Sequence, residues 1–183
     1  MSTKGHALFM YRNAISENDF LANYFWEGLT QGDLCVLVSA HSRKDTIHMF
    51  ATSGHDIEPY LKRNDLRIYN MTDTYLPNGE FVAKYMLSNV QSFVAEAKAL
   101  GYKGLRTAGE MSWIEDNTEY VPEAVSYEAS VNHLSEPDLK FTGLCMYRLG
   151  SDTVEIVEES LKQHPSYVYD GKVSKSPYYA GAG

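Results

Sequence analysis

The chain has 183 residues, 44% of them hydrophobic and 22% charged, and a formal net charge of −8. This length and composition predict one soluble domain with a core that needs no disulfide or metal to stabilise it. The acidic balance and the lack of a basic cluster argue against a nucleic-acid surface. No apolar run approaches the ~20 residues of a membrane span, and no signal peptide is evident. We therefore expect a cytoplasmic protein without a membrane contact.

Strand and helix patterns alternate from the start of the chain. Residues 6–11 form a short apolar run that is typical of a buried strand. The apolar face that follows predicts a helix, which Ser16 would cap and Gly32 would end. Residues 33–39 are largely apolar and β-branched, and predict a central parallel strand that is buried on both faces.

The same alternation continues to the end of the chain. Ser42 and Asp45 are typical of a capping pair for a helix that Gly54 ends. A turn near residues 56–60 leads to a strand over residues 66–69, and Pro77-Asn-Gly79 breaks the chain. The later predicted elements are a helix over about 80–100, a strand over 104–108, a helix from Pro122 to Leu134, a strand over 141–147, a helix that Asp152 and Glu155 cap and that reaches Leu161, and an edge strand over 167–169.

This order of elements predicts an α/β fold with three layers, in which helices flank a mostly parallel central sheet on both faces. We expect residues 1–170 to form one domain and residues 171–183 a flexible tail. A phosphate loop would be the first motif to seek in such a fold, but none is present. Nucleotide hydrolysis is therefore not expected.

The histidines and cysteines give no clear metal motif. His41, His48 and His55 recur every seven residues, but the first and last fall outside the predicted helix, so we expect solvated histidines. Cys35 and Cys145 lie inside apolar runs and are interpreted as buried free thiols. We predict no metal site, no cofactor and no catalytic residue.

Two arrangements of acid, base and nucleophile remain as alternatives. Cys145 with His164 and Glu110 or Glu128 would suit a hydrolase or transferase, although burial in the middle of a strand makes a thiol inert. Glu110 and Glu128 would suit acid–base work, and equally an ion pair with Arg106 or Arg148 that only fixes geometry. Both interpretations of the two glutamates stay open.

The segment Arg106-Thr-Ala-Gly-Glu110-Met-Ser-Trp113 is the most informative in the chain. It places a carboxylate and an indole at the predicted C-terminal end of a strand. In an open α/β sheet, ligands bind where strand ends deliver side chains into a crevice. A polar strand exit beside a buried Trp is the alternative. The 14 tyrosines of the chain also suit a pocket with apolar walls and hydroxyl tips.

The assembled motifs resemble the MEDS family, the methanogen/methylotroph DcmR-type sensory domain. The resemblance covers nearly the whole chain, and Gly-Glu-Met-Ser-Trp in register with Tyr-Glu and Cys-x-Tyr is its most specific part. The matching segments are His6, Phe25-Trp-Glu-Gly28-Leu-Thr-Gln-Gly32-Asp-Leu-Cys35-Val, Thr74-Tyr-Leu-Pro-Asn-Gly79-Glu-Phe81, Gly101-Tyr-Lys-Gly-Leu-Arg106 through Trp113, Tyr127-Glu128 with Asn132, Leu144-Cys145-Met-Tyr147, and His164-Pro165.

This resemblance implies a non-enzymatic input module of prokaryotic signal transduction. Members of the family are proposed to sense small hydrocarbon derivatives, and their fold is distantly similar to that of RecA and KaiC, here without a phosphate loop. The residues expected to bind the ligand are His6, Arg106, Glu110, Trp113, Tyr127, Glu128, Cys145, Tyr147 and His164. A degenerate nucleotide-binding interaction protein is a further alternative.

The resemblance also implies a signalling partner. A sensory domain that stands alone must act through another protein, such as a histidine kinase or a transcription regulator, or through a homodimer. The loops over residues 73–79 and 115–121 are rich in turn-forming residues. We expect one of them to be the element that a ligand shifts between two states.

Overall fold

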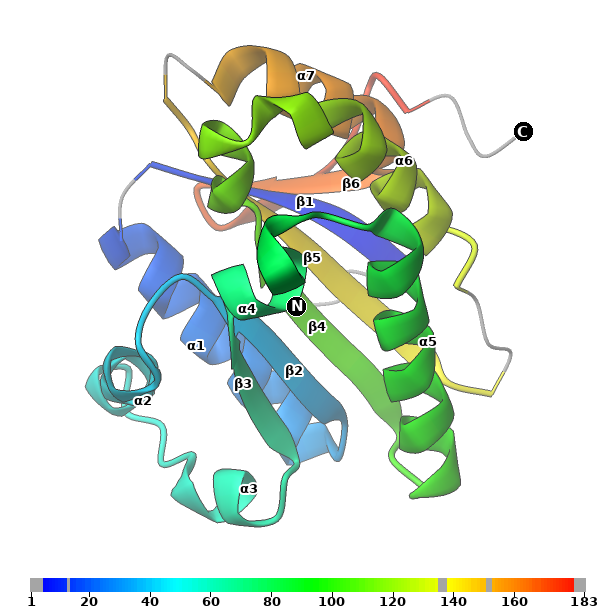
Figure 1. Ribbon diagram of the computed structural model, residues 1–183. Helices are drawn as coiled ribbons and strands as arrows, with labels where there is room; N and C mark the ends of the chain where they lie inside the picture. The colour runs from blue at the N-terminus through cyan, green and yellow to red at the C-terminus, as the bar shows by residue number, and fades with distance from the viewer. Residues whose placement is uncertain (1–4, 13, 135–137, 151–152, 180–183) are drawn as a thin grey trace.

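The computed structural model describes residues 5–12, 14–134, 138–150 and 153–179, with the side chains of 14–17 left out. Its strands form one sheet in the order β3-β2-β4-β5-β1-β6-β7 (Figure 1). All neighbouring pairs are parallel except β6 and β7. The strands are β1 (Gly5–Tyr11), β2 (Leu34–Ser39), β3 (Leu66–Asn70), β4 (Gly104–Glu110), β5 (Lys140–Arg148), β6 (Ser166–Tyr169) and β7 (Lys172–Lys175). The predicted mostly parallel α/β sheet is confirmed.

Helices cover both faces of this sheet. The helices are α1 (Ala14–Gln31), α2 (Arg43–Thr52), α3 (Glu58–Lys62), α4 (Met71–Tyr75), α5 (Ala83–Ala99), α6 (Val121–Val131) and α7 (Val154–Gln163), with short 3-10 helices η1 (Pro77–Gly79), η2 (Ser112–Asp116) and η3 (Thr118–Tyr120). The buried side chains of α1 and α2 pack on one face, and those of α5, α6 and α7 pack on the other. Within the described ranges, no helix is long and apolar enough to cross a membrane.

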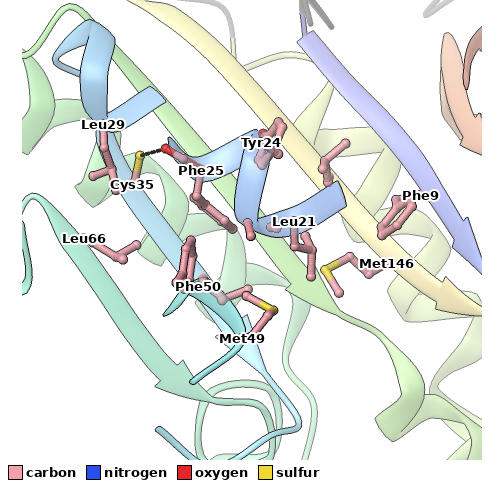
Figure 2. Close-up of a cluster of buried hydrophobic side chains, with 14 of the residues drawn as sticks. Phe9, Leu21, Tyr24, Phe25, Leu29, Cys35, Met49, Phe50, Leu66 and Met146 are labelled. Carbon is pink, nitrogen blue, oxygen red and sulfur yellow. Dashed lines mark hydrogen bonds between the residues drawn. The ribbon is translucent and has the colours of Figure 1, made fainter. Parts of the chain in front are cut away.

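The core under α1 explains why this helix and β2 lie together. All six residues of β2 are buried, as predicted for a central parallel strand. On the α1 side, Phe25 and Phe50 are fully buried around Cys35 (Figure 2). The Cys35 thiol lies 3.9 Å from the carbonyl oxygen of Phe25 and has no disulfide partner. Cys35 is therefore a core thiol, as its apolar neighbours in the sequence predicted.

The helix caps predicted from the sequence agree with the structure only in part. The Ser42 side chain caps α2 by accepting a hydrogen bond from the Asp45 N–H, as predicted. By contrast, α1 begins at Ala14, so Ser16 lies inside the helix and not at its start. Asp152, the predicted cap of α7, lies outside the described residues. The predicted helix over residues 80–100 is α5.

Three segments differ from their expected form. Residues 73–79 and 115–121 were expected to be loops, but α4, η1, η2 and η3 fill most of them. Asn78 has a φ of 66° and so adopts the left-handed conformation that this Pro-Asn-Gly turn requires. The segment expected as a tail carries β7, which pairs with β6 and extends the sheet past the predicted edge strand.

Candidate functional site

A cavity of about 510 Å³ lies between the sheet and α5. Strands β2 to β5 form its floor, and α4, α5 and α6 form its walls. Val36, Val38, Val90 and Phe93 give it apolar surfaces, and its walls are mostly apolar, although polar side chains such as Asn89 and Thr107 also border it. A volume of roughly 300–1,000 Å³ with mostly apolar walls and a few polar groups is typical of small-molecule sites.

Two glycines on neighbouring strands leave room in this region. A side chain at Gly109 of β4 would overlap the Tyr75 hydroxyl, and one at Gly143 of β5 would lie 2.9 Å from the Phe141 ring. Glycine inside a strand often marks such a close approach. Because Gly109 has no side chain, Tyr75 can lie directly over β4 and close one end of the cavity.

Two histidines and a cysteine converge where β1 and β5 border the cavity. His6 Nε2 lies 3.0 Å from Cys145 Sγ and 3.1 Å from His164 Nε2. All three side chains are buried. Strand pairing explains the contact, because β1 lies beside β5 and the chain returns through α7 to His164. His6 and Cys145 line the cavity directly.

A hydrogen-bonded carboxylate lies behind this cluster. Glu128 is fully buried and accepts hydrogen bonds from the Tyr147 hydroxyl at 2.7 Å and from the Ser160 hydroxyl at 3.0 Å. The Ser160 carbonyl accepts a hydrogen bond from His164 Nδ1 at 2.7 Å. Glu128, Ser160, His164, His6 and Cys145 thus form one connected polar network inside an otherwise apolar core.

Burial sets the protonation states of this network. Desolvation, reinforced by the neighbouring His164, holds the pKa of His6 well below its usual value, and desolvation also lowers the pKa of His164. Burial, together with the nearby carboxyl of Glu128, raises the pKa of the Cys145 thiol. In the arrangement observed, both rings are neutral and the thiol is protonated near neutral pH. A protonated, buried thiol is a poor nucleophile.

Arg106 and Glu110 lie on the α1 face of the sheet, away from the cavity. Arg106 donates a hydrogen bond to the Tyr24 carbonyl at 2.7 Å and lies 3.4 Å from carboxylate oxygens of Glu27 and Asp33. Glu110 accepts hydrogen bonds from the Tyr11 hydroxyl and the Ser112 N–H. Among the described residues, neither Glu110 nor Glu128 forms an ion pair with Arg106 or Arg148.

Trp113, the aromatic residue of the Arg106–Trp113 segment, lies behind the residues that line the cavity. Trp113 is buried and stacks on Phe81 and Tyr75, with ring centroids 4.7 and 5.4 Å apart. Tyr75 separates Trp113 from the cavity, so the indole supports the wall without lining it. Of this segment, only the stretch over residues 107–109 borders the cavity.

The structure therefore divides the expected ligand-binding residues into groups. His6, Tyr127 and Cys145 line the cavity, and Glu128, Tyr147 and His164 support that lining from behind. Two residues of the site, Tyr75 and Ser160, were not among the expected ligand-binding residues. Tyr75 lies in the segment Thr74–Phe81 that carries the family resemblance, whereas no motif marks Ser160. His41 and His48 are exposed, as expected, and His55 stacks on Trp26.

Solved structures define the class of fold. The chain superposes on a KaiC-like protein of Pyrococcus horikoshii OT3 with a TM-score of 0.59 and 16% identity, covering 89% of this chain and 69% of that one. An uncharacterised P. horikoshii protein, solved with an unknown peptide, gives 0.65 at 13% identity over 91% and 77% of the two chains. Flagellar accessory protein FlaH of Methanocaldococcus jannaschii gives 0.51 at 8% identity over 92% and 74%. The fold is thus of the RecA/KaiC-like class.

The family follows from the sequence itself. The family model described as "MEthanogen/methylotroph, DcmR Sensory domain" matches residues 5–165. The chain belongs to this MEDS family of sensory domains. No curated protein sequence matches it.

Proposed function

We propose that this domain senses a small, weakly polar molecule, which binds in the cavity between α5 and the sheet. The observation that carries the proposal is the cavity of about 510 Å³, with apolar walls and the buried His6 and Cys145 at one side. The mostly apolar walls favour a hydrocarbon body, and the buried polar groups of His6 and Cys145 favour a polar or polarisable atom on it. This is the ligand class that the family resemblance implies.

Charge supports an uncharged ligand. Among the described residues, Asp73 is the one charged side chain that borders the cavity, and it is exposed. The chain as a whole carries a net charge of −8. An anionic ligand would therefore enter against the field of the protein and find no cationic partner among the lining residues.

The cavity opens beside elements suited to pass on a signal. Tyr69 and Tyr85 line the cavity and are 39% and 51% exposed, so they lie at its mouth. Val82, at the start of α5, is 45% exposed. Tyr69, Tyr85 and Val82 thus form an exposed, largely apolar surface beside the cavity, and a ligand that moves α5 or residues 73–79 would change it. Such a surface suits contact with a protein partner such as a histidine kinase or a transcription regulator.

Thermal unfolding with small organic probes tests the proposal. Dichloromethane, 1-butanol and 2-butanone should each be compared with buffer, because a ligand that binds only the folded state raises the Tm. For a domain of this size, each kcal/mol of added stability shifts the Tm by about 2–4 °C. We expect at least one probe to raise the Tm in this way.

A pair of variants on α5 locates the effect. Val90 lines the cavity, so Val90→Trp should fill it and abolish the shift. Gln91 is exposed on the same helix, so Gln91→Trp is the matched control and should keep the shift. A shift that survives in Val90→Trp, or no shift with any probe, would contradict binding of this ligand class in the cavity.

A further inference from the structure

Three metal-binding side chains meet at one point beside the cavity. His6, Cys145 and His164 each place a donor atom within 4.8 Å of the other two, and all three side chains are buried. Imidazole nitrogen and thiolate sulfur are the ligands that Zn²⁺ prefers in proteins. The side chains come from β1, β5 and the end of α7, so rigid elements hold two of the three donors.

The hydrogen bonds of His164 orient it as a ligand. Its Nδ1 lies 2.7 Å from the Ser160 carbonyl, which can only accept, so Nδ1 carries the proton. Nε2 therefore presents its lone pair to His6, whose Nε2 is 3.1 Å away. A metal-bound histidine commonly donates its second ring N–H to a carbonyl or carboxylate in this manner.

The neighbouring side chains leave His6 poorly satisfied. Its Nε2 faces both His164 Nε2 and Cys145 Sγ, while its buried Nδ1 has no hydrogen-bond partner among the residues that the structure describes. If His6 carries its proton on Nε2, it can donate a hydrogen bond to only one of its two neighbours. If it carries the proton on Nδ1, that N–H is a buried donor without an acceptor. The side chain of Asn132 lies near His6. Asn132 donates its Nδ2 hydrogen to the Gln163 carbonyl, which leaves its Oδ1 as an acceptor. Asn132 thus offers an acceptor for Nδ1 once Nε2 binds a metal.

The surrounding charge also suits a cation. Glu128 is a fully buried carboxyl group that accepts hydrogen bonds from the hydroxyls of Tyr147 and Ser160 and lies beside the Cys145 thiol. It forms no ion pair with a lysine or arginine among the described residues. A buried carboxylate without a positive partner is unfavourable. A divalent ion bound by the neighbouring His164 and Cys145 would provide that partner.

We propose that His6, Cys145 and His164 bind one Zn²⁺ ion, or a metal of similar softness, and leave its fourth position open toward the cavity. Zinc bonds of about 2.0–2.3 Å place two tetrahedral nitrogen donors about 3.3–3.4 Å apart and a nitrogen and a sulfur about 3.5–3.6 Å apart. The 3.1 Å separation of the two ring nitrogens needs to widen by about 0.2 Å and the 3.0 Å separation of His6 Nε2 and Cys145 Sγ by about 0.5 Å. The donor atoms of His164 and Cys145 lie within 4.8 Å of each other. Three protein ligands with an open position are typical of zinc sites that bind a further molecule.

The use of this metal rests on the sensory function proposed above. Because His6 and Cys145 line the cavity, a molecule bound there would reach the open position with its polar or polarisable atom. The apolar walls would select the hydrocarbon body, and the metal would select the donor atom. This arrangement explains how a largely apolar cavity distinguishes a functionalised molecule from a plain hydrocarbon.

Metal analysis of the untagged full chain tests the site itself. The protein is treated with a chelator, reloaded with Zn²⁺ or Co²⁺, and freed of excess metal. We expect one equivalent of metal and, with Co²⁺, the charge-transfer absorption of a cobalt–thiolate bond. Cys145→Ser should remove this absorption, and His164→Gln should weaken metal affinity at least about tenfold. Cys35→Ser and His133→Gln are the matched controls and should retain both signals.

Circular dichroism and Tm show whether each variant is folded. A folded Cys145→Ser protein that keeps the thiolate signal, or a folded wild-type chain that takes up no Zn²⁺ or Co²⁺, would overturn the proposal. Probe binding is then measured with and without Zn²⁺. Metal uptake without any probe-induced Tm shift would support the site and contradict the sensory function. A Tm shift without metal uptake would support the sensory function and overturn the metal site.

Discussion

The hydroxyl group of Tyr75 occupies the space that a side chain at position 109 would need. This contact joins α4 to β4 and fixes one wall of the cavity. It also connects the cavity to Trp113, which stacks on the same tyrosine. The glycine of the Gly-Glu-Met-Ser-Trp motif is therefore needed for packing at the site, although the glutamate that follows it faces away.

Gly109→Ala should destabilise the fold by about 1–3 kcal/mol, because the new methyl group overlaps the Tyr75 hydroxyl. Combining it with Tyr75→Phe should recover part of the loss, since the overlapping atom is removed. Urea unfolding of the single and double variants measures this coupling. Gly150→Ala is the control, because its nearest neighbour would be 3.9 Å away. Additive effects of the two substitutions would contradict the contact.

Arg106→Met should cost about 3–5 kcal/mol of stability, because it leaves the buried Asp33 without its positive partner. Adding Asp33→Asn should restore part of that loss. Any folded Arg106 variant should keep the ligand response, since Arg106 lies on the α1 face. Urea unfolding and probe-induced Tm shifts measure the two effects separately. Normal stability with a lost ligand response would instead place Arg106 in the site.

Glu110 gives a pH dependence of known sign. Burial raises its pKa, although hydrogen bonds from Tyr11 and Ser112 oppose the rise. A raised folded-state pKa means that the contribution of Glu110 is fully present below its unfolded-state pKa of about 4.3 and is lost as the pH rises through the folded-state value. The stability of wild type relative to Glu110→Gln should therefore increase as the pH falls from neutral toward that window. Urea unfolding across this range would show the opposite slope if the carboxyl were held ionised.

Both cysteines should react slowly in the native protein. Cys35 and Cys145 are buried, and burial raises the pKa of each thiol. Iodoacetamide labelling near neutral pH, followed by mass spectrometry, should modify both only as fast as the protein opens. Unfolded protein in urea is the control. Rapid modification of native Cys145 alone would favour the hydrolase or transferase alternative.

Nucleotides should leave the Tm unchanged, because the sequence has no phosphate loop. A ligand at about 100 times its Kd adds about 2.7 kcal/mol of stability. Millimolar ATP or ADP with Mg²⁺ would therefore produce a clear shift if either bound with micromolar affinity. A Tm shift of that size would contradict this prediction and support the alternative of a degenerate nucleotide-binding interaction protein.

The fold was largely predictable because its signals are local. The continuous apolar run of β2, the capping pair at Ser42 and the amphipathic length of α5 each act within one element. The site was less predictable, because its contacts join residues far apart in the chain. His6 meets Cys145 only because β1 lies beside β5, and the strand order is not visible in the residue pattern.

The faces of β4 show the same limit. Arg106 and Glu110 have the same parity along the strand, so a strand places their side chains on one face. The sequence does not show that α1 covers this face and α5 the other. That assignment depends on the path of the chain between the strands. As a result, Arg106 and Glu110, which were expected to bind the ligand, instead make structural contacts on the α1 face.

The most direct test of the central claim is a titration of isotopically labelled protein with dichloromethane, followed by NMR. If a small, weakly polar molecule binds in the cavity, the largest shifts will fall on residues that face it, such as Val90, Gly109 and Cys145. These shifts should saturate and disappear in Val90→Trp. Shifts that stay on the outer surface, or that never saturate, would contradict a ligand site between α5 and the sheet.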